Sequence, residues 1–357
     1  MLCVSVLPAS AEDVSVSAQA YVLYCPQNEE IILSENKDAR LPMASTTKVM
    51  TALLTLEEAQ KDNCAVEFTE EMTAEGSSMY LEVGEQVTLY DLAVGMLMQS
   101  GNDAANAAAI AIDGSLQSFA DRMNIKASEL GMKNTHFVTP SGLDDEDHYS
   151  TAYDMALLLS AAMENDAFRE ITENTSMTVD FVCPDDKRVT YQNHNKLLKF
   201  YEPCIGGKTG YTERAGRCLV TCAEKDGVRL ICVTLDDPDD WDDHIALFEE
   251  GFSRVKASTL GEGETFSVPL VGAAADAVTL ICEPQTAVLP ADAQVERKVI
   301  LPDFVYAPVK RGETLGEIRY LSDGKEILKL PLVADEDIDG TKQKTLLDYI
   351  KGIFYWL

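Results

Sequence analysis

Two spacings of apolar residues alternate along the first 257 residues of the chain. Short β-type runs at residues 20–25 and 31–34 flank a polar turn and predict a pair of strands. Apolar positions three and four residues apart are typical of helices with one buried face. On these grounds we expect helices over 88–98, 102–113, 115–131, 151–164 and 242–255, and strands over 176–182, 216–223 and 228–235.

The pattern changes after about residue 258, where short β-type runs are separated by Gly, Pro and Asp. Asp226-Gly227 and Asp323-Gly324 each stand between two predicted strands and favour tight hairpins. The chain therefore predicts the α+β class, with a first domain at 12–257 and a small β-rich domain at 258–337. The strands expected in the second domain cover 264–271, 277–283, 295–301, 315–321 and 326–333.

The two ends differ from the rest. Met1–Ala11 is apolar and ends in Ala9-Ser10-Ala11, which is typical of a secretory cleavage site, so we expect 1–11 to be the remnant of a signal peptide. No Lys or Arg precedes Lys37, and an ordinary N-terminus is the alternative. Residues 338–357 predict an amphipathic tail with three lysines and an aromatic end. Such a tail favours a membrane surface, with a helix packed on the β-domain as the alternative.

Charge and composition limit the classes of partner and ligand that the protein can bind. The formal net charge of −31 argues against nucleic acid, because phosphate binding needs a basic surface. The nine cysteines include no C-x-x-C pair, and the four histidines are scattered without ligand spacing. We therefore predict no metal and no cofactor. Cys218 and Cys222 should share one buried face of a strand.

Three short motifs carry the candidate chemistry: Ser45-Thr46-Thr47-Lys48, Ser100-Gly101-Asn102 and Lys208-Thr209-Gly210. A serine becomes a good nucleophile when a neighbouring base takes its proton. Residues three apart share one face of a helix, so Lys48 can reach the Ser45 hydroxyl. Burial near a second cation, for which Lys208 is the candidate, would let Lys48 lose its proton and act as that base.

The other motif residues have predicted roles as well. Ser100 can relay protons, and the Asn102 amide can hold Lys48 and a substrate carbonyl. Lys208 and Thr209 would bind a carboxylate. Gly210 would leave a strand edge open to an extended substrate, and the backbone amides of Ser45 and Tyr211 would form an oxyanion hole. Each motif alone is common in proteins, as a pair on a helix surface, a turn or a loop. Their joint occurrence in one chain argues against coincidence.

The motifs and their surroundings resemble the D-alanyl-D-alanine carboxypeptidases, the low-molecular-mass penicillin-binding proteins of peptidase family S11. The resemblance covers nearly the whole chain and includes 41–54 (LPMASTTKVMTALL), 97–106, 130–160, 204–221 and 306–334. It implies a β-lactamase/transpeptidase-like catalytic domain, in which helices flank an antiparallel sheet. It also implies removal of the terminal D-alanine from peptidoglycan stem peptides, inhibition by β-lactams, and a place at the extracytoplasmic face of the bacterial membrane.

The chain departs from this family at two positions. Some members carry a histidine where Ser141 stands, and some carry an arginine where Asp240 stands. This leaves Lys208, Thr209 and Arg214 as candidate carboxylate anchors. A β-lactamase on the same fold, with Glu146 holding the hydrolytic water, is one alternative function. A penicillin-binding protein without turnover is another.

The tail leads to the first prediction. A variant truncated after Asp339 should keep its turnover, because the three motifs all precede residue 211. It should lose binding to anionic liposomes, because interfacial aromatics and lysines favour such surfaces. Liposome co-sedimentation of the full-length and truncated proteins checks this. Equal binding by both contradicts the anchor, and lost activity shows that the tail is structural.

Overall fold

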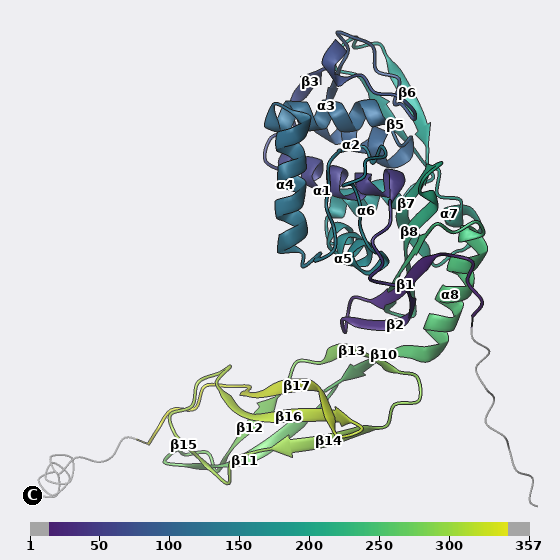
Figure 1. Cartoon of the computed structure of the whole chain (residues 1–357). Coiled ribbons are helices and arrows are strands. Elements are labelled where there is room, and N and C mark those ends of the chain that lie inside the picture. Colours follow the sequence, from purple (N-terminus) through teal and green to yellow (C-terminus); the bar gives the residue numbers. More distant parts are fainter. Residues whose placement is uncertain (1–13, 342–357) are drawn as a thin grey trace, which may run out of the picture. The chain divides into compact units, whose positions relative to one another are not determined.

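The computed structural model describes residues 14–341 in two compact units (Figure 1). The first unit ends at Arg254 and the second begins at Val255, whereas the sequence pattern puts this boundary after residue 257. The expected signal remnant, 1–11, lies outside the described residues, as do residues 342–357 of the expected tail. No helix of the described part is long and apolar enough to cross a membrane.

An antiparallel five-stranded sheet forms the centre of the first unit, in the order β2-β1-β9-β8-β7, so that β7 is an edge strand. Together with the helices around it, this sheet confirms the predicted fold class. The strands are β1 (Ala20–Cys25), β2 (Glu30–Glu35), β7 (Cys204–Thr212), β8 (Gly216–Lys225) and β9 (Val228–Leu235).

Helices cover both faces of this sheet, which is why β1 is buried along its whole length. α5 packs on β1 and β9, and α8 packs on β8 and β9. The predicted helices are present within two residues of their expected bounds; α6 and α7, which are short, were not predicted. The helices are α1 (Lys48–Ala59), α2 (Leu89–Met98), α3 (Asn102–Asp113), α4 (Leu116–Glu129), α5 (Ala152–Met163), α6 (Asp166–Glu173), α7 (Leu197–Phe200) and α8 (Asp240–Arg254).

Alternation along the strands assigns each side chain to one of the two faces. Thr221 and Thr234 lie against α8, where their hydroxyls are 2.7 and 3.1 Å from the ring nitrogens of buried His244. Cys218 and Cys222 are both fully buried in the core on the other face, as predicted. Minor elements complete the unit: η1 (Ala44–Thr47), η2 (Glu70–Met72), β3 (Ala65–Glu67), β4 (Gln86–Thr88), β5 (Ser176–Asp180) and β6 (Arg188–Gln192).

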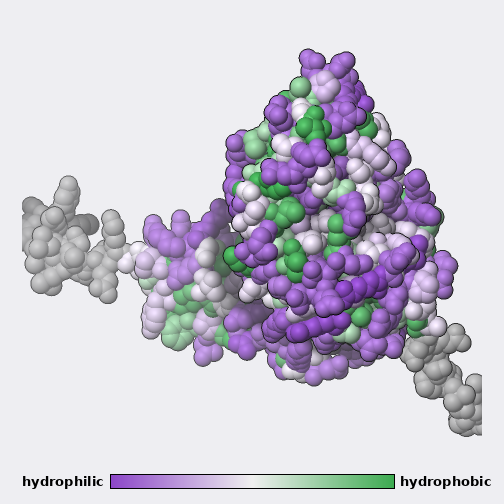
Figure 2. All heavy atoms as spheres, turned by 45° about the horizontal axis from the view of Figure 1, so that its top comes forward, coloured by the Kyte–Doolittle hydropathy of each residue, from purple (hydrophilic) through white to green (hydrophobic). Residues whose placement is uncertain are grey.

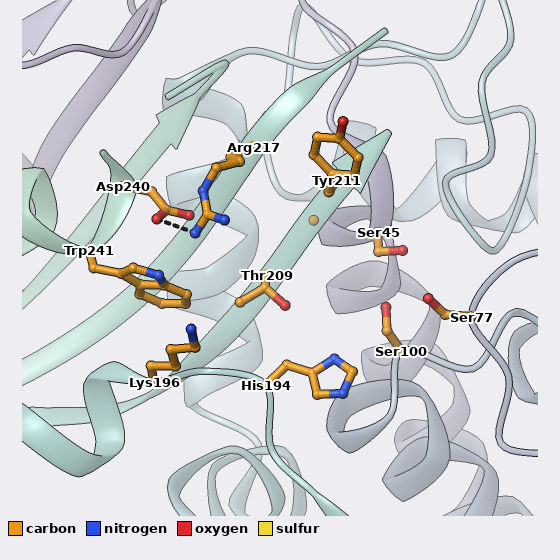
Figure 3. A pocket seen from close by; sticks show the side chains of 11 residues that line it. Ser45, Ser77, Ser100, His194, Lys196, Thr209, Tyr211, Arg217, Asp240 and Trp241 are labelled. Carbon is orange, nitrogen blue, oxygen red and sulfur yellow. Dashed lines mark hydrogen bonds and ion pairs between the residues drawn. The ribbon is translucent and has the colours of Figure 1, made fainter. Parts of the chain in front are cut away.

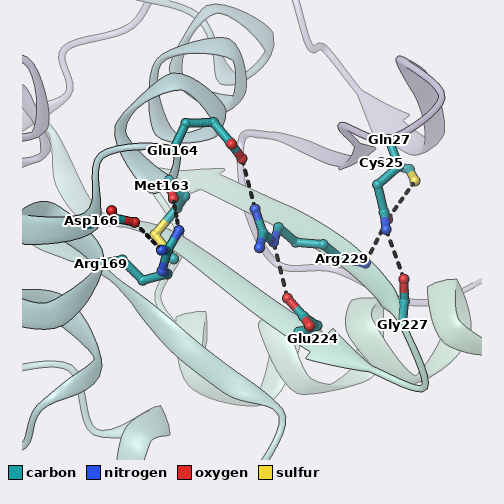
Figure 4. Close-up of polar contacts among 9 residues, drawn as sticks. All are labelled: Cys25, Gln27, Met163, Glu164, Asp166, Arg169, Glu224, Gly227 and Arg229. Carbon is teal, nitrogen blue, oxygen red and sulfur yellow. Dashed lines mark hydrogen bonds and ion pairs between the residues drawn. The ribbon is translucent and has the colours of Figure 1, made fainter.

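The predicted Asp226-Gly227 hairpin joins β8 to β9, and both residues have positive φ, 51° and 79°, as a type I′ turn requires. Figure 4 shows how neighbouring elements hold this turn. The Gln27 side chain donates to Gly227 O at 2.8 Å and accepts from Arg229 N at 2.8 Å. The Arg229 guanidinium then reaches Glu164, at the end of α5, at 2.9 Å. These contacts hold the end of the sheet at the β8–β9 turn in place.

In the described part of the second unit, up to residue 341, the regular elements are all strands. A six-stranded sheet has the order β14-β16-β17-β12-β11-β15, and β10 pairs with β13. The five predicted strands and the Asp323-Gly324 hairpin are present; β10, β13 and β15 were not predicted. The strands are β10 (Val255–Leu260), β11 (Thr265–Val271), β12 (Ala277–Ile281), β13 (Gln285–Pro290), β14 (Val295–Ile300), β15 (Val305–Tyr306), β16 (Thr314–Ser322) and β17 (Lys325–Ala334).

The surface reflects the composition. Figure 2 shows a face that is mostly hydrophilic, with small and separate hydrophobic areas. Acidic residues outnumber basic ones by 60 to 29 in the chain, so this polar surface carries a strong negative charge. Cationic side chains that line a cavity therefore have the opposite charge to most of the protein surface.

Candidate functional site

Ser45 lies in a short 3-10 helix, η1, that runs directly into α1. The sequence predicted one helix through Ser45 and Lys48; instead Ala44 enters the turn with a positive φ of 48°. A non-glycine residue in this region is strained, and such strain clusters at functional sites. Residues i and i+3 eclipse in a 3-10 helix, so Lys48 still lies beside Ser45.

Lys48 is fully buried, and its Nζ has three oxygen neighbours. The distances are 2.9 Å to Ser45 Oγ, 2.6 Å to Asn102 Oδ1 and 2.6 Å to the backbone oxygen of Ser141. Ser45 and Asn102 belong to the predicted motifs. The Ser141 carbonyl was not predicted, because a backbone oxygen leaves no signature in the sequence.

Burial lowers the pKa of Lys48 well below its usual value, and the nearby charge of Lys208 lowers it further, against a smaller opposing effect of Asp103. Burial also lowers the pKa of Lys208 to about 7. Removing an amino group from water disfavours its charged form. The site therefore favours the neutral form of the Lys48 amine.

Ser100 and Asn102 lie where α2 ends and α3 begins. Ser100 has a positive φ of 61°, and its Oγ accepts a hydrogen bond from Lys208 Nζ at 3.1 Å. Asn102 Nδ2 donates to Glu75 O at 2.6 Å, which turns Oδ1 toward Lys48. This contact uses one of the two N–H groups of the amide, so the predicted contact of Asn102 with a substrate carbonyl stays a prediction.

Strand alternation separates two residues that the sequence grouped together. Lys208 and Thr209 are neighbours in β7, so their side chains point to opposite faces. Lys208 is buried and donates to Ser100 Oγ and Thr209 O, and it does not line the pocket described below. Thr209 does line it. The structure thus places Lys208 beside Ser100 and Thr209, which line the pocket, and the predicted contact of Lys208 with a carboxylate stays a prediction.

Gly210 allows β7 to approach the Ser45 turn. A Cβ built on Gly210 would lie 3.0 Å from Met43 O, 3.0 Å from Thr46 N and 3.1 Å from Ser45 N. The sequence suggested that this glycine leaves room for substrate; in the structure the backbone of the Ser45 turn lies against it. The approach brings the backbone of Tyr211 next to that of Ser45.

The loop that carries Ser141 is held against the same turn. A Cβ on Gly142, whose φ is 83°, would lie 2.0 Å from Ala44 O, so only glycine fits there. Buried His148 closes the loop: its Nδ1 accepts from Val138 N at 2.9 Å, and its Nε2 lies 2.8 Å from Thr47 Oγ1. Since Nδ1 accepts, the ring proton sits on Nε2 and is donated to Thr47.

A cavity of about 300 Å³ opens over Ser45, and Figure 3 shows the side chains around it. Three predicted side chains line it, those of Ser45, Ser100 and Thr209, together with Gly210 and Tyr211. Arg214 is exposed and lies outside the lining, as does Glu146. The lining residues that the sequence did not predict are Ser77, His194, Lys196, Arg217 and Trp241.

No motif includes these five residues, and they come together only through the fold. Arg217 pairs with Tyr211 across the β7–β8 hairpin, and knowledge of that register would have placed it at the pocket. Asp240 and Trp241 begin α8. Within the described residues, no group of three or more His, Cys, Asp or Glu side chains is arranged to hold a metal ion.

Comparison with known proteins identifies the family to which the chain belongs. A model of the peptidase S11 family, described as D-alanyl-D-alanine carboxypeptidase, matches residues 7–239. A model described as penicillin-binding protein 5, C-terminal domain, matches residues 254–340. The chain is 32% identical to a D-alanyl-D-alanine carboxypeptidase of Bacillus subtilis over 350 residues, which cover 94% of this chain and 89% of that protein.

A second relative is a D-alanyl-D-alanine carboxypeptidase of Mycobacterium tuberculosis, 33% identical over 68% of this chain and 85% of that protein. Among solved structures, penicillin-binding protein 5 from Haemophilus influenzae aligns with a TM-score of 0.72 and 28% identity, covering 92% of this chain and all of that one. The chain therefore belongs to the D-alanyl-D-alanine carboxypeptidase family of serine peptidases, and it is a hydrolase of that class.

His148 gives the second prediction. Burial lowers its pKa to about 4 from the usual 6.5. The unfolded chain therefore takes up the proton first as pH falls, so the free energy of unfolding should decrease from pH 6.5 to pH 4, by up to roughly 3 kcal/mol from this residue. Buried His244, whose pKa is lowered to about 3, acts in the same direction.

Urea unfolding at pH 7 and pH 4.5 measures the effect. His148→Gln should be less stable at pH 7 and should lose less stability on acidification than the wild type. His136→Gln, at an exposed histidine of the same loop, is the control; its charge makes only a minor contribution to the lowered pKa of His148, so this variant should retain most of the wild-type difference. An unchanged difference in His148→Gln contradicts the assignment.

Proposed function

We propose that Ser45 is the nucleophile of a serine D-Ala-D-Ala carboxypeptidase that removes the terminal D-alanine from peptidoglycan stem peptides. Ser45 Oγ attacks the carbonyl carbon between the two D-alanines and forms an ester, and free D-alanine leaves. Water then hydrolyses the ester and regenerates Ser45. The single observation that carries this proposal is the environment of the Lys48 amine.

Burial of the Lys48 amine favours its neutral form, and its hydrogen-bond partners leave that form free to act as a base. A neutral amine has two N–H bonds and one lone pair. Asn102 Oδ1 and Ser141 O can only accept hydrogen bonds, and each lies 2.6 Å from Lys48 Nζ. They use both N–H groups, so the lone pair faces Ser45 Oγ at 2.9 Å. Lys48 can thus take the Ser45 proton during attack.

The leaving amine of D-alanine needs a proton, and we assign its delivery to Ser100. Its hydroxyl lines the pocket that holds Ser45 and accepts a hydrogen bond from Lys208 Nζ at 3.1 Å. The pKa of Lys208, about 7, suits proton exchange at neutral pH. The proton that Lys48 removes from Ser45 can in this way be balanced by one delivered to the departing nitrogen.

We assign the stabilisation of negative charge on the attacked carbonyl oxygen to the backbone amides of Ser45 and Tyr211. The close approach of Gly210 to Ser45 N supports this, since it brings the two backbones together. One such donor is typically worth about 3 kcal/mol of barrier. β7 lies at the edge of its sheet, and this favours an extended peptide added beside it.

The alternative functions have less support. A β-lactamase would need a carboxylate near Ser45 to hold water, but Glu146 is exposed and outside the pocket lining. Among the described lining residues only Asp240 carries a carboxylate. A protein without turnover would not need the buried Lys48 contacts. We further propose that the enzyme is inhibited by β-lactams and works at the extracytoplasmic face of the cytoplasmic membrane, attached through its tail.

Penicillin should acylate Ser45, because a β-lactam presents a strained amide to the same nucleophile. Intact-mass measurement after incubation with benzylpenicillin should show one adduct on the wild type and none on Ser45→Ala. Ser77→Ala removes another serine hydroxyl of the same pocket and should still be acylated. An adduct that persists on Ser45→Ala contradicts the assignment.

Lys48→Met should slow acylation by about 10²–10⁴-fold, because loss of a general base typically has this effect. Lys61→Met, at an exposed lysine just after α1, is the control and should acylate at the wild-type rate. The wild-type rate should rise with pH through the lowered pKa of Lys48, since only the neutral amine accepts a proton. Stopped-flow acylation across pH measures both effects. A Lys48→Met variant that is folded and acylates normally would show that the base is elsewhere.

A further inference from the structure

The end of the pocket away from Ser45 carries charged side chains that the proposed chemistry does not use. Figure 3 shows Ser45 and Ser100 at one end and Arg217, Asp240 and Trp241 at the other. The two ends belong to different elements: the first to η1 and the α2–α3 junction, the second to β8 and the start of α8. A ligand long enough to fill the pocket would contact both.

Arg217 is fixed in orientation while part of it stays open. Its Nη2 lies 2.5 Å from Asp240 Oδ1, and its guanidinium lies 5.6 Å from the Trp241 ring. The Asp240 side chain is 3% exposed, whereas that of Arg217 is 41% exposed. Arg217 Nε is buried and has no hydrogen-bond partner within the described residues. A guanidinium has five N–H donors, so donors remain for a ligand.

The charges at this end of the pocket are also unbalanced. Lys196 is exposed, lines the pocket, and makes no ion pair with any described residue. Among the side chains that line this pocket, two cations therefore face one carboxylate, that of Asp240; Asp239 and Asp242 line a second cavity that Lys196 and Arg217 also border. This local excess of positive charge favours an anionic group on the ligand. A planar guanidinium is well suited to a carboxylate.

Strand geometry connects this end of the pocket to the nucleophile. Thr209 and Tyr211 are two residues apart in β7 and share one face, and Arg217 lies opposite Tyr211 in the register of the hairpin. Gly210, between them, touches the Ser45 turn. A peptide extended beside β7 advances about 3.4 Å for each residue. A peptide bound with its last residue directed away from Ser45 would bring that residue to the part of the pocket lined by Thr209 and the guanidinium.

We propose that Arg217 contacts the free C-terminal carboxylate of the peptide substrate, and that Asp240 is a positioning residue that orients the guanidinium. The inference rests on the proposed function, because it takes the ligand to be a peptide cleaved at its last bond. Arg217 then selects substrates that end in a free acid. Arg214, which the sequence offered as an anchor, is exposed on the same hairpin and takes no part.

A pair of ligands that differ only in this carboxylate tests the proposal. The probes are N-acetyl-D-Ala-D-Ala and its C-terminal amide. Calorimetric binding to Ser45→Ala measures recognition without turnover, and kcat/KM of the otherwise unchanged enzyme measures its effect on catalysis. With Arg217 present, binding and kcat/KM should favour the acid over the amide. Arg217→Gln should reduce this acid-to-amide ratio by about 10- to 100-fold, with little change in the values for the amide.

Three further variants sharpen the result. Arg217→Lys should retain part of the preference for the acid that Arg217→Gln loses, because lysine keeps the positive charge but lacks the paired N–H donors of a guanidinium. Asp240→Asn should lower the preference for the acid while amide turnover stays the same, which a purely structural role would not produce. Arg214→Gln is the matched control and should leave the preference unchanged.

The opposing outcomes are distinct. If Arg217→Gln weakens acid and amide alike, or leaves their ratio unchanged, the proposal is overturned. If the Ser45→Ala protein prefers the acid in an Arg217-dependent way but the wild type shows no turnover, the proposed function fails and the carboxylate contact stands.

Discussion

The rest of the site depends on the burial of one amino group, that of Lys48. Burying a lysine is costly unless its polar atoms are satisfied or its charge is lost. Here both conditions are met, because oxygens of Asn102 and Ser141 receive its N–H groups while burial lowers its pKa. Asn102 is in turn fixed by Glu75, and the Ser141 loop is tied to Thr47 through His148. Elements far apart in the sequence thus converge on one nitrogen atom.

Close packing of backbones around Ser45 imposes a second constraint. Gly210 and Gly142 both lie against the turn that carries Ser45, and a Cβ at either position would meet backbone atoms of that turn. The turn itself starts with Ala44 in a strained conformation. Such strain persists only when the surroundings determine it. Strand β7 on one side and the loop on the other supply that restraint.

The sequence predicted much of this arrangement because its strongest signals are local. The motifs identify Ser45, Lys48 and Asn102, and strong periodicity marks helices such as α3 and hairpins such as Asp226-Gly227. Contacts that depend on register were missed. The opposite directions of Lys208 and Thr209 follow from strand alternation once β7 is known, and Arg217 reaches the pocket only through its pairing with Tyr211. The Ser141 carbonyl is a backbone atom, so no residue type could have indicated it.

The cations of the site differ in what their chemistry allows. Lys48 and Lys208 are buried, and burial brings their pKa values down so that each can exchange a proton. An arginine keeps its charge under the same conditions, because its guanidinium does not lose a proton in proteins. Arg217 is the more exposed of the three and is held by a buried carboxylate. In the proposed mechanism the two lysines therefore transfer protons, and the arginine, whose charge persists, recognises the anion.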